Sequence, residues 1–107
     1  MKPITDKAEV SIDFPDKAYI GSFSRHSAFE VRADGEGIVL KLSHPGEDHR
    51  TAEVHLHYYL LADILEEASK AIAAQSALDD AHREPLLAAA TNLGRVLTTN
   101  PAGSRAK

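Results

Sequence analysis

The fold is decided by one stretch of the sequence, residues 28–42, which reads AFEVRADGEGIVLKL. Apolar and polar residues alternate on both sides of its Asp-Gly-Glu-Gly centre, and this period of two is typical of half-buried β-strands. A two-residue loop that begins with glycine favours a type II′ turn, whose twist matches that of the flanking strands. The stretch therefore predicts an antiparallel hairpin with Gly35 and Glu36 as its loop.

The register of this hairpin follows from the two-residue loop. It pairs apolar side chains on one face of the hairpin and sets Glu30 opposite Lys41 on the other face. A slip of two residues would keep the apolar pairs but lose this pair of opposite charges. The expected apolar pairs are Ala33 with Ile38, Val31 with Leu40, and Phe29 with Leu42.

The alternation predicts further strands on both sides of the hairpin, at residues 9–14, 18–24 and 52–57. Pro15-Asp16 and Pro45-Gly46 supply turns between strands. In the strand at residues 18–24, Ile20 lies on the opposite face from Tyr19 and Phe23. The alternation there is therefore poor, and both faces of the strand carry apolar side chains. Five strands are therefore expected before residue 58.

From Tyr58 onward the apolar residues recur at spacings of three and four, which predicts a helix that ends before residues 76–80. Two starts of a second helix remain open. Asp79 or Asp80 can cap a helix that contains Pro85, or the helix begins at residues 84–85 with proline at its favoured first position. Residues 98–107 have no periodicity and are expected to form a flexible tail.

Strands followed by helices predict an α+β domain. We expect a five-stranded, mainly antiparallel β-meander, with two C-terminal helices packed on the face that bears Val31, Leu40 and Leu56. The 107 residues suit a single domain, ordered from about residue 8 to residue 97.

Composition excludes several classes of protein. The chain has 43% hydrophobic and 26% charged residues, no cysteine, and 12 basic against 16 acidic side chains. No apolar run approaches the roughly 20 residues of a membrane span. The excess of acid argues against nucleic-acid binding. Because no secretory signal and no cysteine are visible, we expect a cytoplasmic protein.

Three side chains of the last strand suggest a metal site. Glu53, His55 and His57 lie on one face of it, because side chains alternate along a strand. His44 lies in the preceding loop and could add a third nitrogen. Imidazole and carboxylate together suit zinc or non-haem iron.

The pairing expected for this strand argues against that site. If Leu42 faces Val54, then Lys41 faces His55, and its ammonium would repel both a cation and a protonated imidazole. Metal binding by the histidine cluster therefore stays the alternative hypothesis, and no cofactor is expected.

Apolar residues on the second face of the sheet suggest an interface instead. Tyr19, Phe23 and Val39 lie opposite the face assigned to the helices, and such residues on an open face often mark an interaction surface. We therefore expect a non-enzymatic module that self-associates as a homodimer or binds another protein.

Overall fold

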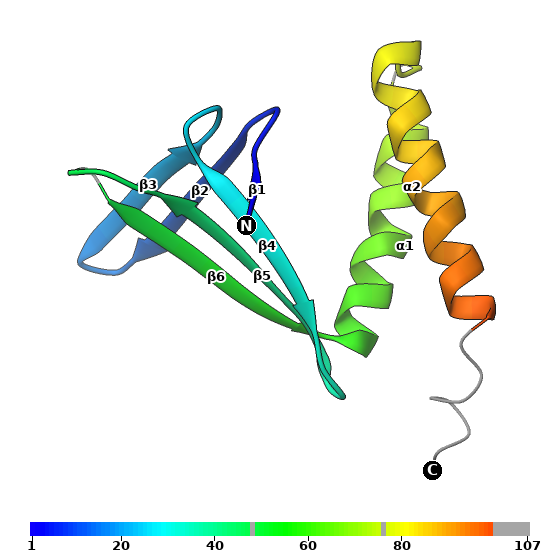
Figure 1. The fold of residues 1–107 in the computed structure, drawn as a ribbon, viewed down its shortest axis with the longest axis horizontal. Coiled ribbons are helices and arrows are strands. Elements are labelled where there is room, and N and C mark those ends of the chain that lie inside the picture. The colour runs from blue at the N-terminus through cyan, green and yellow to red at the C-terminus, as the bar shows by residue number, and fades with distance from the viewer. Residues whose placement is uncertain (48, 76, 100–107) are drawn as a thin grey trace. The chain divides into compact units, whose positions relative to one another are not determined.

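A computed structural model describes residues 1–47, 49–75 and 77–99, in which six strands precede two helices (Figure 1). The predicted α+β class and order of elements are confirmed. Neither helix is long and apolar enough to cross a membrane. The chain divides into two compact units, Met1–Ala68 and Ser69–Lys107. The elements are β1 (Lys2–Pro3), β2 (Ala8–Phe14), β3 (Lys17–Phe23), β4 (Ala28–Ala33), β5 (Gly37–His44), β6 (Arg50–His57), α1 (Tyr58–Ala74) and α2 (Asp80–Thr98).

The predicted hairpin of β4 and β5 is confirmed together with its register. Glu30 pairs with Lys41, and the three expected apolar pairs are all present. The type II′ turn is wrong, because Gly46 alone among the described glycines has a positive φ. Instead, Oδ1 of Asp34 accepts hydrogen bonds from the amides of Glu36 (2.8 Å) and Gly37 (2.9 Å), and this carboxylate shapes the loop.

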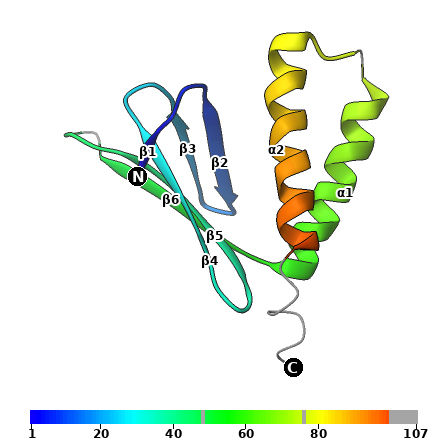
Figure 2. The ribbon, with the colours of Figure 1, turned by 45° about the vertical axis from the view of Figure 1, so that its right-hand side comes forward.

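The single five-stranded sheet is wrong, since the strands form two sheets (Figure 2). One sheet has the order β1-β4-β5-β6, and the other is the β2–β3 hairpin. The unpredicted strand β1 pairs with β4, Lys2 opposite Phe29, and the Ile4 amide donates to the Ser27 carbonyl over 3.0 Å. β1 thus lies beside Ala28 and Phe29 at this edge of β4, and β3 pairs with β2 alone.

The expected register between β5 and β6 is wrong by two residues. Leu40 lies opposite Val54, and Lys41 lies opposite Glu53 rather than opposite His55. Both registers place apolar side chains on the same face, so the apolar pattern does not distinguish them. The observed register gains a pair of opposite charges, the same feature that selects the first hairpin.

Arg50 joins the two sheets. Its guanidinium lies 5.4 Å from the centre of the Phe23 ring, and its Nε and Nη2 donate to the Ser22 carbonyl over 3.1 and 2.5 Å. Phe23 is only 2% exposed. The last residues of β3 are therefore fixed to the first residue of β6.

Each helix begins with a defined contact. The Tyr58 amide donates to the Glu36 carbonyl over 3.0 Å, and the Tyr58 hydroxyl donates to the Asp34 carbonyl over 2.8 Å. At α2, Asp79 is the N-cap and accepts from the His82 amide. The earlier of the two predicted starts is therefore correct. Pro85 lies inside the helix, where it removes one backbone donor.

Candidate functional site

Two of the three predicted interface residues are buried. Phe23 is 2% exposed and Val39 is 8% exposed, and Tyr19 alone of the three is exposed. The expectation of an open face there is wrong for Phe23 and Val39. Phe23 lies beneath Arg50, and Val39 lies in the central strand between Arg32 and His55.

The opposite face of the main sheet is apolar and partly open. Val31 is 53% exposed and Val54 is 47% exposed. Leu40 and Leu56, on the same face, are half-buried. This is the face on which the helices are expected to pack. That packing concerns the two units of the chain and stays a prediction.

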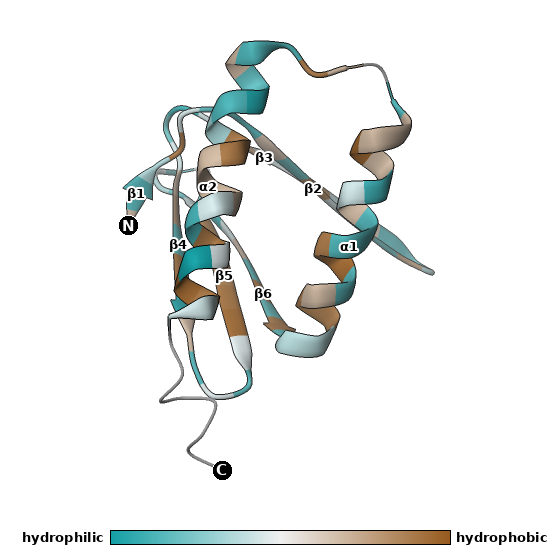
Figure 3. Ribbon diagram, turned by 90° about the vertical axis from the view of Figure 1, so that its right-hand side faces the viewer, coloured by the Kyte–Doolittle hydropathy of each residue, from teal (hydrophilic) through white to brown (hydrophobic). Residues whose placement is uncertain are grey.

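The helices also carry uncovered apolar side chains. Figure 3 shows hydrophobic residues along both of them, and none of the described residues in either helix is buried. The large exposed apolar residues of the helices are Tyr58, Tyr59, Leu60, Ile64, Leu65, Ile72, Leu86, Leu87, Leu93, Val96 and Leu97.

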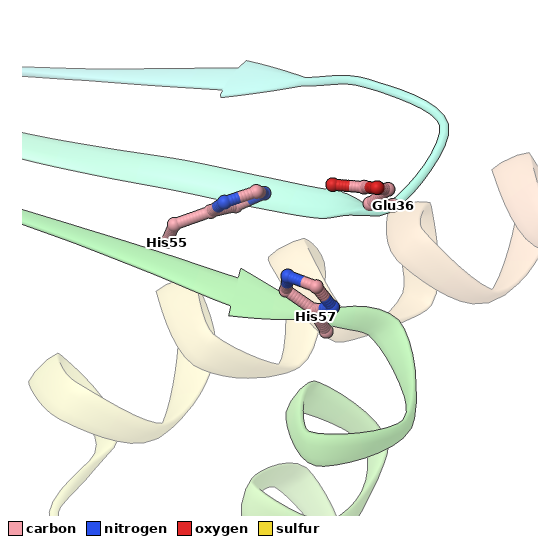
Figure 4. A group of neighbouring side chains, drawn as sticks. All are labelled: Glu36, His55 and His57. Carbon is pink, nitrogen blue, oxygen red and sulfur yellow. The ribbon is translucent and has the colours of Figure 1, made fainter.

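A second candidate site lies where the β4–β5 loop meets the end of β6. Each of Glu36, His55 and His57 offers one ligand atom there, and the three atoms lie within 4.8 Å of one another (Figure 4). The two imidazole rings have their centres 4.8 Å apart. All three side chains are exposed, so a cation could reach them from solvent.

The structure confirms the expected proximity of His55 and His57 but replaces their predicted partners. Glu53 lies opposite Lys41, and Nδ1 of His44 lies 2.9 Å from the hydroxyl of Ser27, which is buried. Neither belongs to the group formed with Glu36. Glu36 is not among the predicted ligands, because its place depends on the pairing of Gly37 with His57, which brings the β4–β5 loop beside the end of β6.

A second carboxylate lies beside this group. Oδ2 of Asp34 is 3.7 Å from Nε2 of His55. Hydrogen bonds from the Glu36 and Gly37 amides hold the pKa of Asp34 below its usual value, and the charges of the two histidines act in the same direction. Asp34 therefore adds negative charge to the surroundings of His55.

Comparison of the chain with protein-family models, with curated proteins and with solved structures found no match.

Proposed function

We propose that this domain functions by self-association, as a non-enzymatic homodimer whose interface includes the apolar stripe of α2. One observation carries the proposal: α1 and α2 are amphipathic helices, yet none of their described residues is buried. Amphipathic helices gain most of their stability by burying an apolar face, so such a face needs a partner.

The stripe on α2 consists of Leu86, Ala90, Leu93 and Leu97, spaced by four, three and four residues. Positions at this spacing lie within one face of a helix. Ala88 lies on the opposite side, about 200° from Leu86 around the axis. The stripe can therefore be tested separately from the rest of the helix.

The apolar character of the helix faces supports a second copy of this chain as the partner, because both helices expose large hydrophobic side chains. Apolar faces of this kind suit obligate interfaces better than transient ones.

A twofold axis would bring the same face of two copies together, which is the commonest arrangement of soluble oligomers. No second component is then required to cover the helices. We place this association in a reducing compartment such as the cytoplasm, because a chain without cysteine needs no disulfide.

Light scattering coupled to size exclusion tests the proposal. We expect twice the chain mass of 11.6 kDa across the micromolar range. Leu93→Lys should shift the protein toward the monomer, because it puts a charge into the apolar stripe. Ala88→Lys adds the same charge on the opposite side of α2 and should leave the dimer intact.

A wild-type mass of 11.6 kDa at the highest concentration would overturn self-association. It would point instead to a different protein, or to the other unit of the same chain, as the cover of the helices. Equal dissociation by both lysine variants would remove the α2 stripe from the interface.

A further inference from the structure

The loop of the β4–β5 hairpin and the end of β6 bring three side chains of metal-binding type together. Two imidazole nitrogens and one carboxylate oxygen converge, from His55, His57 and Glu36 (Figure 4). Two histidines and one carboxylate are an established set of protein ligands for zinc sites that keep one coordination position open. Oxygen-rich sites for calcium or magnesium do not have this composition.

We propose that Glu36, His55 and His57 bind one divalent transition-metal ion of the zinc class. The fourth position is left to water or to a donor from another molecule. This site is independent of the proposed self-association.

The separations suit this assignment. Ligand atoms around a tetrahedral zinc ion lie about 3.3 Å apart, given metal–nitrogen distances near 2.0 Å. The three ligand atoms already lie within 4.8 Å of one another. Because all three side chains are exposed, small rotations about their side-chain bonds can close the difference without moving the strands.

The backbone that carries the ligands is held in place. Gly37 pairs directly with His57, and a Cβ atom at Gly37 would lie 2.1 Å from the Leu56 carbonyl oxygen. The Tyr58 amide, next to His57, donates to the carbonyl of Glu36 itself. The ligand-bearing segments are thus joined before any ion arrives, which lowers the entropic cost of binding.

The local charges favour a cation. Lys41, which the expected register had placed opposite His55, lies opposite Glu53 instead. Val39 takes its place opposite His55, and the Asp34 carboxylate lies 3.7 Å from the His55 ring. The Lys41 ammonium therefore does not lie directly opposite His55, where it would repel a cation. The Asp34 carboxylate adds a second negative charge, after that of Glu36, beside the His55 ring.

Titration calorimetry with zinc chloride tests the site on untagged, chelator-treated protein. We expect one ion per chain, and at least a tenfold loss of affinity in His55→Ala and in His57→Ala. Glu36→Gln should also weaken binding. Two matched controls, His26→Ala and Glu53→Gln, remove a histidine and a carboxylate outside the group and should bind as the wild type does.

Proton NMR supplies a second measurement. The ring protons of His55 and His57 should shift or broaden on addition of zinc, while those of His26 should not. Circular dichroism of each variant verifies that its fold is kept.

The absence of stoichiometric zinc binding would overturn the assignment. A loss of zinc affinity in His26→Ala equal to that in His55→Ala and His57→Ala would overturn it too. A loss of zinc affinity in Glu53→Gln without any loss in Glu36→Gln would also overturn the assignment, since the carboxylate ligand would then lie on β6. Calcium chloride binding with an affinity equal to that of zinc would contradict the ligand class.

Discussion

At Gly37 the backbone of β5 approaches β6 too closely for any side chain. A Cβ atom there would lie 2.1 Å from the Leu56 carbonyl oxygen and 2.7 Å from the Cα atom of His57. Both obstacles are backbone atoms, so no side-chain rotation can relieve the contact. The last pair of the β5–β6 ladder therefore depends on glycine.

We expect Gly37→Ala to lower the free energy of unfolding by about 1–3 kcal/mol, as steric overpacking does. Gly35→Ala is the matched control in the preceding loop, with no atom within 4 Å of the added Cβ and no positive φ. It should change stability by less than about 0.5 kcal/mol. Urea denaturation compares the two, and equal midpoints would contradict the close approach.

Phe23 is the most buried large side chain among the described residues, at 2% exposure beneath the guanidinium of Arg50. We expect Phe23→Ala to lower the free energy of unfolding by about 3 kcal/mol, because it leaves a cavity between the two sheets. Ile20, in the same strand, is 84% exposed. Ile20→Ala should cost less than about 0.5 kcal/mol.

Chemical denaturation followed by circular dichroism measures both variants. A similar loss of unfolding free energy in Phe23→Ala and Ile20→Ala would mean that Phe23 lies outside the core, as the sequence pattern had suggested. Burial could not be predicted there, because it depends on Arg50, which is distant in the chain.

Helix α2 depends on its N-cap. The backbone amide of His82 donates to the Asp79 carboxylate. The imidazole ring of His82 lies within hydrogen-bond distance of the same carboxylate and adds a second interaction. Together these interactions hold the pKa of Asp79 below its usual value. A carboxyl group whose pKa is lowered on folding stabilises the folded helix above its ordinary pKa, and this stabilisation is lost as the pH falls through the lower value.

We therefore expect the helical signal at 222 nm to hold as the pH falls toward 3.8 and to decline below it. Asp79→Asn keeps a capping oxygen but cannot titrate, so its decline over this range should be smaller than that of the wild type. Identical acid profiles of the two proteins would show that Asp79 does not contribute.

The elements could be predicted largely from local pattern. The alternation located five strands within a few residues of their bounds, and the spacing of three and four located the first helix. Strand β1 was missed because its two residues carry no periodicity. Its partner in β4 lies far along the chain, so the two-sheet topology was missed with it.

The candidate metal site could be predicted only in part. Alternation in β6 was enough to place His55 and His57 on one face. The third ligand, Glu36, depends on the register between β5 and β6. Two registers that differ by two residues place the same apolar side chains on the same face, so the apolar pattern cannot choose between them. The pair of Lys41 with Glu53 was the available signal, and it would have brought Glu36 to the site.

For the whole molecule, the proposed self-association predicts that stability depends on protein concentration. If two copies bury the apolar faces of their helices, the melting temperature should rise with protein concentration, because association favours the folded state. In Leu93→Lys this dependence should be weaker than in Ala88→Lys. Calorimetric scans over a hundredfold range of concentration measure it, and a constant wild-type melting temperature would contradict the dimer.

The pairing of β1 with β4 has a consequence for the order of folding. β2 with β3, β4 with β5, and β5 with β6 are neighbours along the chain, so these pairs close short loops. β1 must instead cross the whole β2–β3 hairpin to reach β4, which costs more loop-closure entropy. On the ribosome β1 is synthesised before β4, so it has no partner until residues 28–33 have emerged. We therefore expect β1 to be the last strand to join this sheet, and the edge of β4 beside Ala28 and Phe29 to remain open until then.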